Sequence, residues 1–215
     1  LNDVILKAKQ ANDYFLLIGP PGTGKTSYAL VAMVKEALSE SSSILLSAYT
    51  NRAVDEICDK MDKHKIQYIR IGSELSCDER FRKNLLDEKI RLNPNADILR
   101  KVIQETQVFV GTITSISGKL NLFDIKHFDL AIIDEASQIL EPNLLGILCA
   151  RHKNQTAIDK FIFIGDHKQL PAVVQQSERE SIVSEPELIK IGMSDCRNSL
   201  FERLINIQKK KSCLL

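Results

Sequence analysis

The sequence predicts an α/β fold in which a mostly parallel sheet is covered by helices on both faces. Three observations support this prediction. A glycine-rich loop of the phosphate-binding type follows a short apolar run near the start of the chain. Apolar runs rich in β-branched residues then alternate with segments whose apolar residues have helical spacing. Strands that alternate with helices are joined by parallel crossovers, and such sheets are buried on both faces.

The predicted elements alternate along most of the chain. Each predicted strand is an apolar run, and the runs are 14–18, 43–48, 67–71, 108–112, 130–134 and 161–165. Apolar residues at helical spacing lie between most of these runs and after the last one. The predicted helical stripes are Leu30/Met33/Val34/Ala37/Leu38, Val54/Ile57/Cys58/Met61, Ile98/Leu99/Val102/Ile103 and Leu200/Phe201/Leu204/Ile205.

Three stretches depart from this alternation. Residues 73–94 lose the strand pattern and are rich in charge, so we interpret them as an inserted helical hairpin outside the sheet. Residues 177–186 are interpreted as a surface loop before the last helix. Residues 209–215 are interpreted as a solvated helix end or a linker rather than a basic contact patch. The whole chain, 1–215, is expected to be one large domain with this insertion.

Charge and cysteine content narrow the class of protein. Lys and Arg number 29 against 28 Asp and Glu, a formal net charge of +1, so any contact with nucleic acid has to be local. The five cysteines form no C-x-x-C pair, and an odd number argues against a closed disulfide framework. No run approaches the roughly 18 apolar residues that a membrane span requires. We therefore expect an intracellular protein with free thiols and no membrane partner.

The glycine-rich loop fits the pattern G-x-x-x-x-G-K-[ST], which predicts binding of a nucleoside triphosphate. Its glycines let backbone N–H groups approach phosphate oxygens closely at the start of a helix. Lys25 is expected to contact the β- and γ-phosphates, and the Thr26 hydroxyl to ligate Mg²⁺. The expected nucleotide-binding residues are Gly19, Pro20, Pro21, Gly22, Thr23, Gly24, Lys25, Thr26 and Ser27.

An acidic motif follows the apolar run 130–134 and reads Asp134-Glu135-Ala136-Ser137-Gln138. A strand of this kind places its carboxylates at the C-terminal edge of a parallel sheet, where phosphate loops also lie. Asp134 is the expected Mg²⁺ ligand, directly or through water. Glu135 is expected to orient and deprotonate the attacking water. Acidic pairs also occur as plain solvated strand ends, and the phosphate loop is what favours a site here.

A third motif follows the run 161–165 and reads Gly165-Asp166-His167-Lys168-Gln169-Leu170-Pro171. Gln169 can both donate and accept hydrogen bonds, so we expect it to contact the γ-phosphate and the water. Gln169 completes the expected catalytic set with Lys25 and Glu135. His167 is interpreted as a polar loop residue, because Glu135 is available as the base. The other histidines show no metal-ligand spacing and are interpreted as surface residues; they are His64, His127 and His152.

These three motifs resemble motifs I, II and III of superfamily 1 helicases. Their form is closest to the 1B branch, which includes the nonsense-mediated-decay helicase and the Okazaki-fragment nuclease-helicase. The segments 47–55 and 110–114 resemble motifs Ia and Ic, which in the family touch the backbone of a single strand. The resemblance implies nucleic-acid contacts from Thr50, Asn51, Thr112 and Thr114. Such groups bond phosphates without reading sequence, but they also cap helices, and both interpretations are open.

The resemblance further implies a RecA-like P-loop NTPase domain that is the first lobe of a two-lobe motor. In such helicases ATP and Mg²⁺ bind between the lobes, and the second lobe supplies an arginine that stabilises the transferring phosphate. No strands for a second lobe follow in this sequence. We therefore expect the second lobe of the same parent protein as a partner, and weak turnover by this lobe alone.

The expected function is ATP-driven movement on single-stranded DNA or RNA. The alternative is a nucleotide-gated switch or binding module without motor activity. A small-molecule kinase shares the phosphate loop, but it leaves the 134–138 motif and Gln169 unexplained.

Overall fold

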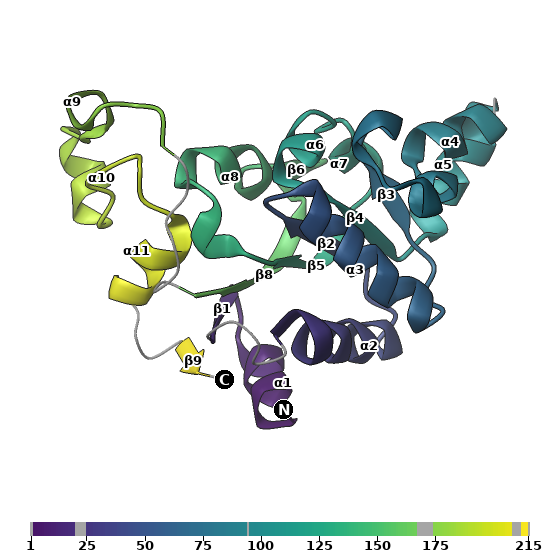
Figure 1. Cartoon of the computed structure of the whole chain (residues 1–215), viewed down its shortest axis with the longest axis horizontal. Helices are drawn as coiled ribbons and strands as arrows, with labels where there is room; N and C mark the ends of the chain where they lie inside the picture. Colours follow the sequence, from purple (N-terminus) through teal and green to yellow (C-terminus); the bar gives the residue numbers. More distant parts are fainter. Residues whose placement is uncertain (1, 20–24, 94, 167–173, 208–211, 215) are drawn as a thin grey trace.

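The computed structural model describes residues 2–19, 25–93, 95–166, 174–207 and 212–214. In this part of the chain seven strands form one sheet in the order β3-β4-β2-β5-β8-β1-β9, and each of its described pairings is parallel (Figure 1). The strands are β1 (Tyr14–Ile18), β2 (Ile44–Ala48), β3 (Ile69–Ile71), β4 (Val108–Thr112), β5 (Phe128–Ile133), β8 (Ile158–Gly165) and β9 (Ser212–Leu214). The short strands β6 (Arg151–His152) and β7 (Gln155–Thr156) pair with each other in antiparallel fashion.

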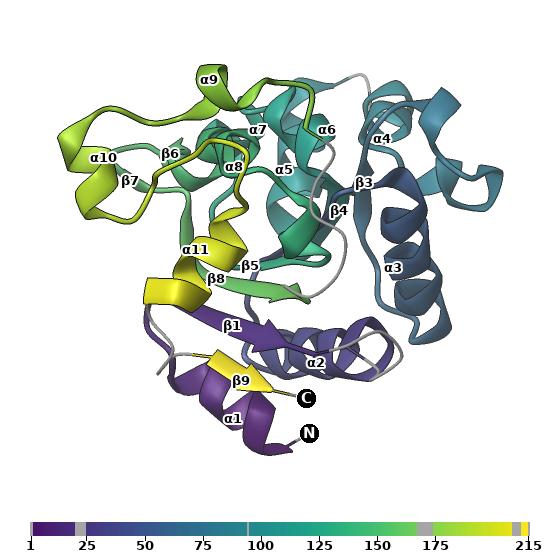
Figure 2. The same ribbon diagram turned by 60° about the vertical axis from the view of Figure 1, so that its left-hand side comes forward.

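Helices lie on both faces of the sheet, as Figures 1 and 2 show. The α-helices are α1 (Asn2–Gln10), α2 (Val31–Ser39), α3 (Asn51–Lys63), α4 (Leu86–Leu92), α5 (Ala96–Glu105), α6 (Ile113–Ser117), α7 (Leu122–Ile125), α8 (Glu141–Leu148), α9 (Glu178–Ser181), α10 (Pro186–Lys190) and α11 (Leu200–Ile207). A π-helical segment, η1 (Lys25–Leu30), leads into α2. Three 3₁₀ segments complete the set: η2 (Glu74–Ser76), η3 (Glu79–Asn84) and η4 (Ala136–Gln138).

Two apolar cores lie on opposite faces of the sheet, because successive side chains of a strand point to opposite faces. In β1, Phe15 and Leu17 belong to the core that also contains residues of α1, α2 and α3. Leu16 and Ile18 belong to the other core, which contains residues of α6, α7, α8 and α11. Strands buried in this way read as continuous apolar runs in the sequence, so the predicted α/β fold is confirmed.

The stretch 73–94 is built from η2, η3 and α4, and it is anchored beside α3. Phe81 and Leu85 are buried in the core that α3 helps to form. The guanidinium of Arg70 is fully buried; it pairs with Asp55 at 3.0 Å, and its Nε donates to Cys77 Sγ at 2.9 Å. Packing of this kind ties the stretch closely to the domain, and its designation as an insertion stays a prediction.

Two predictions about irregular segments were wrong. Residues 177–186, expected to form a loop, contain α9 and the start of α10, which Figures 1 and 2 place at one end of the molecule. Ser177 begins α9 with a capping box closed by Glu180. Ser212–Leu214, expected in a helix end or a linker, forms β9 and pairs with Leu16–Ile18. Short elements of this kind are too brief to show a periodicity in sequence.

The helices of the described residues are short. None of their helices has the length and apolar character needed to cross a bilayer.

Candidate nucleotide and nucleic-acid site

Five neighbouring strands end at the same edge of the sheet. The register pairs Ile18 of β1 with Gly165 of β8, and Ile133 of β5 with Phe163 of β8. On the other side β2 lies between β5 and β4. The chain segments that follow β1, β5 and β8 carry the three motifs predicted to bind the nucleotide. The segments that follow β2 and β4 carry the motifs predicted to contact nucleic acid. The fold therefore brings both groups of motifs to one edge, in two adjacent halves.

Asp134 leaves the end of β5 and is buried, with only 3% of its surface exposed. Its backbone N–H continues the sheet by donating to Ser47 O at 2.7 Å. One carboxylate oxygen, Oδ1, accepts the N–H of Glu135 at 3.0 Å. The side chain is thus fixed at the strand end by its own turn.

Glu135 adopts a left-handed backbone conformation, with φ 54° and ψ 33°. This region is sparsely populated by residues other than glycine and asparagine, and its occupation is a form of local strain. The Oε2 atom is buried and has no hydrogen-bond partner among the described residues. Burial, the Asp134 charge and the Glu56 charge, in decreasing order, raise the pKa of Glu135 above its ordinary value. This conformation turns the chain sharply after β5. It leaves the Glu135 carboxylate partly shielded from solvent and close to the negative charges of Asp134 and Glu56.

The ends of β1, β8 and the 134–138 motif are linked by short contacts. Gly19 N donates to Gly165 O at 3.2 Å. Asp166 N donates to Ser137 Oγ at 3.3 Å. A methyl group on Gly165 would lie 3.0 Å from a ring carbon of Phe201 and 3.1 Å from Ser137 N, so only glycine fits there without displacement. The predicted motifs II and III are therefore in direct contact.

Several predicted site residues lie outside the described part of the chain. These are Pro20, Pro21, Gly22, Thr23, Gly24 and Gln169, together with His167. Lys25, Thr26 and Ser27 are described in the backbone alone, as the first residues of η1. β1 ends at Ile18 and η1 begins at Lys25, and the convergence of the side chains stays a prediction.

The four residues predicted to contact nucleic acid lie on adjacent strand ends. Thr50 is the N-cap of α3, and its hydroxyl accepts the N–H of Ala53 at 3.1 Å. Thr112 is buried and caps α6 by accepting the N–H of Ser115 at 3.1 Å. Asn51 and Thr114 are exposed. Both threonine caps exist, so the cap interpretation holds for Thr50 and Thr112, and contact with nucleic acid stays a prediction for all four.

Two residues near the site were not identified from the sequence. Glu56, on α3, contributes negative charge at Glu135, and Ser137 holds the backbone of Asp166. Ser137 was within a recognised motif, whereas Glu56 stands in an ordinary amphipathic helix and carries no signal of its role. Only the packing of α3 against β2 and β4 reveals it.

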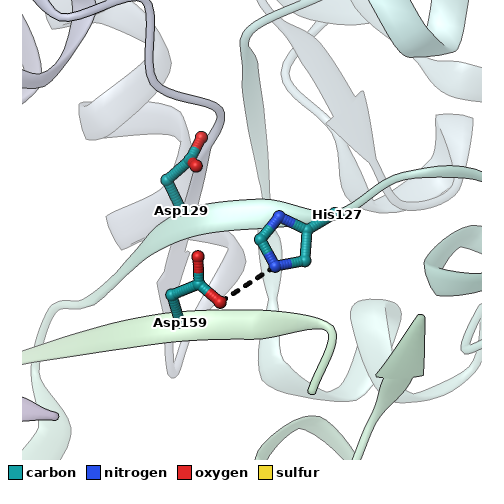
Figure 3. A group of neighbouring side chains, drawn as sticks. All are labelled: His127, Asp129 and Asp159. Carbon is teal, nitrogen blue, oxygen red and sulfur yellow. Dashed lines mark hydrogen bonds and ion pairs between the residues drawn. The ribbon is translucent and has the colours of Figure 1, made fainter. Parts of the chain in front are cut away.

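A second cluster of polar side chains lies where β5 and β8 begin, away from the predicted site. His127 Nε2 is 3.0 Å from Asp159 Oδ1, and Asp129 lies beside them (Figure 3). Potential ligand atoms of these three residues all lie within 4.8 Å of one another. His127 was expected to be a surface residue, and its side chain is partly buried, with 23% of its area exposed. Asp129 follows His127 closely in the sequence, whereas Asp159 comes from the neighbouring strand β8, a proximity that sequence spacing does not show.

Comparison with known proteins gives a consistent result. A family model described as an AAA domain matches residues 2–98 and 87–177. The chain is 37% identical over 174 residues to the DNA replication ATP-dependent helicase/nuclease JHS1 of Arabidopsis thaliana, which covers 81% of this chain and 12% of that protein. It is 34% identical over 197 residues to the DNA replication ATP-dependent helicase/nuclease DNA2 of Gallus gallus, which covers 90% of this chain and 18% of that protein.

Solved structures show the same fold at low sequence identity. The helicase domain of Hef from Pyrococcus furiosus aligns with a TM-score of 0.56 and 16% identity, covering 100% of this chain and 36% of that chain. The UvsW helicase of bacteriophage T4 aligns with a TM-score of 0.53 and 14% identity, covering 90% of this chain and 56% of that chain. These alignments support the RecA-like fold alone.

The chain spans less than a fifth of the length of the curated relatives it matches, 12% and 18% for the two described above. The similarity therefore concerns one domain of much longer proteins. By the family model, the identity to these relatives and the order of its motifs, the chain belongs to the AAA domain family as a RecA-like motor domain of the superfamily 1 helicases.

Proposed function

We propose that this domain binds ATP with Mg²⁺, hydrolyses it, and uses the reaction to move on single-stranded nucleic acid. The observation that carries the proposal is the Asp134–Glu135 turn. It presents a buried carboxylate oxygen without a described partner at the strand end next to β8 and one strand away from the phosphate-loop strand β1. A water-activating base needs this kind of position.

The residues at this edge fit a magnesium nucleotide. Thr26 and Asp134 would hold Mg²⁺, since carboxylate and hydroxyl oxygens are its preferred ligands. When bound, Mg²⁺ would neutralise negative charge on the β- and γ-phosphate oxygens. Asp134 is held in place for this role by its bonds to Ser47 and to the N–H of Glu135. Lys25 would add a point charge on the same phosphates.

Glu135 would take the proton from the attacking water. Its raised pKa makes it a stronger base than an exposed glutamate, and bases work best when their pKa lies near the operating pH. The proton would pass from the water to the Glu135 carboxylate as the new oxygen–phosphorus bond forms and the bond between the γ-phosphorus and the bridging oxygen breaks, releasing ADP and phosphate. Gln169 is proposed to contact the γ-phosphate and to register its departure.

Nucleic acid is proposed to lie along the half of the edge formed by β2 and β4. Asn51 and Thr114 are exposed there and offer an amide and a hydroxyl to phosphate oxygens. The printed names of the curated relatives describe DNA replication helicase/nucleases, which favours DNA over RNA as the strand. A second RecA-like lobe of the same parent protein is the proposed partner that closes the nucleotide site.

Turnover measurements test this proposal. The protein, expressed with whatever sequence flanks these residues, is expected to hydrolyse ATP faster in the presence of single-stranded DNA. Glu135→Gln should retain ATP binding and lose turnover by about 10²–10⁴-fold. The matched control, Glu187→Gln on the exposed helix α10, should behave like the wild type.

The outcomes separate the candidate functions. ATP binding with no turnover in the wild-type protein, with or without a strand, would favour the nucleotide-gated switch. Normal turnover in Glu135→Gln would remove this residue from the role of base. Equal stimulation by RNA and DNA would remove the preference for DNA.

A further inference from the structure

A buried ion pair ties α11 to the start of α8, close behind the Asp134–Glu135 turn. Arg203 Nε donates to Glu141 Oε2 at 2.7 Å, and a second guanidinium nitrogen contacts Oε1 of the same carboxylate. The remaining nitrogen donates to the backbone oxygen of Ile191 at 2.7 Å. The two side chains are only 14% and 7% exposed. Such bidentate, desolvated pairs are geometrically specific.

Backbone contacts join the same two helices at a second point. Glu141 N donates to Asn198 O at 3.1 Å, and Leu140 forms an antiparallel bridge with Ser199. Ser199 in turn begins α11 by accepting the N–H of Glu202 at 3.1 Å. The starts of α8 and α11 are therefore held against each other by side chain and by backbone.

The segment between Glu135 and α8 depends on contacts of this kind. It consists mainly of η4, a 3₁₀ segment of 3 residues whose N-cap makes no side-chain hydrogen bond. Structures this short have little stability of their own. From α11, Phe201 packs against Gly165 and lies close to Ser137. The Glu135 turn is thus positioned from outside, by β8 and α11.

We infer that Arg203 is a positioning residue for the Asp134–Glu135 turn, acting through Glu141. By fixing α11 and α8 together, it sets where the Glu135 carboxylate stands at the edge of the sheet. This inference rests on the proposed function for its effect on turnover, but its effect on the turn is measurable without any activity. Arg203 lies beyond residue 177, where the family model ends.

The chain offers a matched control in Arg197. Its guanidinium also pairs with one carboxylate through two nitrogens. Arg197 Nε donates to Asp195 Oδ2 at 2.9 Å, and a terminal nitrogen donates to the same oxygen at 2.6 Å. Its other described ion pair is with Glu178 at 4.0 Å. These partners lie in the α9–α11 segment, so loss of Arg197 removes a similar ion pair without loosening α8.

The test combines hydrogen exchange with steady-state kinetics on Arg203→Gln and Arg197→Gln. In Arg203→Gln the amides of residues 134–139 should exchange faster than in the wild type, while those of β2 stay unchanged. The kcat for ATP hydrolysis should fall roughly ten- to a hundredfold with the KM for ATP preserved, since small displacements of catalytic groups have effects of this size. Arg197→Gln should change neither measurement.

Arg203→Lys guards against a variant that does not fold. Lysine keeps the charge beside Glu141 but cannot reproduce the planar, forked contact, so an intermediate effect on both measurements is expected. Unchanged exchange at residues 134–139 would overturn the inference. Equal acceleration in β2 would also overturn it, because the role would then be general stability. A wild-type protein without ATP turnover would refute the proposed function alone, and the exchange comparison would still decide the role of Arg203.

Discussion

At the scale of single residues, the site depends on the close approach of backbone segments to one another as much as on charged side chains. Gly165 ends β8 where Phe201 and Ser137 both press on the backbone. The crowding brings the two predicted motifs into contact and leaves no room for a side chain. Packed interiors tolerate added atoms poorly.

Gly165→Ala is expected to destabilise the domain by about 1–3 kcal/mol, because the added methyl group displaces Phe201. Urea unfolding would measure the loss. Gly146→Ala, on α8, is the control: its methyl group would lie 3.7 Å from the nearest described atom, an ordinary contact. Replacement of a helical glycine there is expected to stabilise by about 0.5–1 kcal/mol. Equal effects of the two variants would contradict this account of Gly165.

Asp195 makes a pH-dependent contribution to stability. Hydrogen bonds from Arg197 lower the pKa of Asp195 from 3.8 to about 2. Because the folded-state pKa is the lower one, the contribution is present above the ordinary pKa and is lost as pH falls through it toward the folded value. Asp195→Asn should therefore be less stable than the wild type at neutral pH, and the difference should shrink between about pH 4 and 2. Urea midpoints at several pH values would show this, and a constant difference would contradict it.

At the scale of elements, caps decide where the helices behind the sheet edge begin. Thr50 follows β2 and Thr112 is the last residue of β4, and each starts a helix by accepting a backbone N–H of its first turn. The same residues belong to the segments that resemble helicase motifs. Their structural role and their proposed contact with a strand are separable by experiment.

Thr50→Ala should cost about 1 kcal/mol of stability through loss of the α3 cap, and Thr50→Ser should restore it. Thr114→Ala, at an exposed position, should stay within roughly 0.5 kcal/mol of the wild type. Chemical denaturation checks both. A contact with the strand would appear separately, as weaker binding of single-stranded DNA by Thr114→Ala. Full stability of Thr50→Ala would show that the cap is dispensable.

The sequence predicted the elements whose signal is local. Buried parallel strands read as apolar runs, so β1 and β4 were located to the residue, Tyr14–Ile18 and Val108–Thr112. It did not predict β9, which pairs with β1, far away in the chain. The helical stripe of α5 was only partly right, since Ile103 is buried but Ile98 is exposed.

The same distinction holds for the site. The types and order of the motif residues follow from the chemistry of phosphate binding, and Asp134 and Glu135 stand at the predicted strand end. Contacts between distant segments were not predictable: Ser137 with Asp166 spans 29 positions, and Glu141 with Arg203 spans 62. Such pairs are set by tertiary packing, which no local pattern reports.

At the scale of the whole molecule, one sheet separates two cores, and the predicted ligand would bridge several strand ends. A ligand that binds only the folded state stabilises it by mass action. The effect is therefore a test of nucleotide binding that does not require turnover or a second lobe.

ATP with Mg²⁺ at about 100 times its Kd should stabilise the domain by about 2.7 kcal/mol, a rise in Tm of roughly 5–10 °C for a chain of this size. Lys25→Ala should abolish the shift. Lys35→Ala, at an exposed position on the following helix, should preserve it. Thermal unfolding with and without nucleotide gives the answer, and an undiminished shift in Lys25→Ala would refute the role of this lysine.

The left-handed backbone occurs at Ser41, Lys65, Glu135 and Lys153 among the described non-glycine residues. Glycine adopts this conformation without strain. Selection for stability alone would therefore favour glycine at all of these positions. Ser41, Lys65 and Lys153 lie in turns outside the predicted site. Glycine at position 135 would relieve the backbone strain but would remove the carboxylate. Retention of glutamate there would therefore indicate selection for the chemistry of its side chain, and its replacement by glycine in a related protein would indicate that hydrolysis is no longer selected.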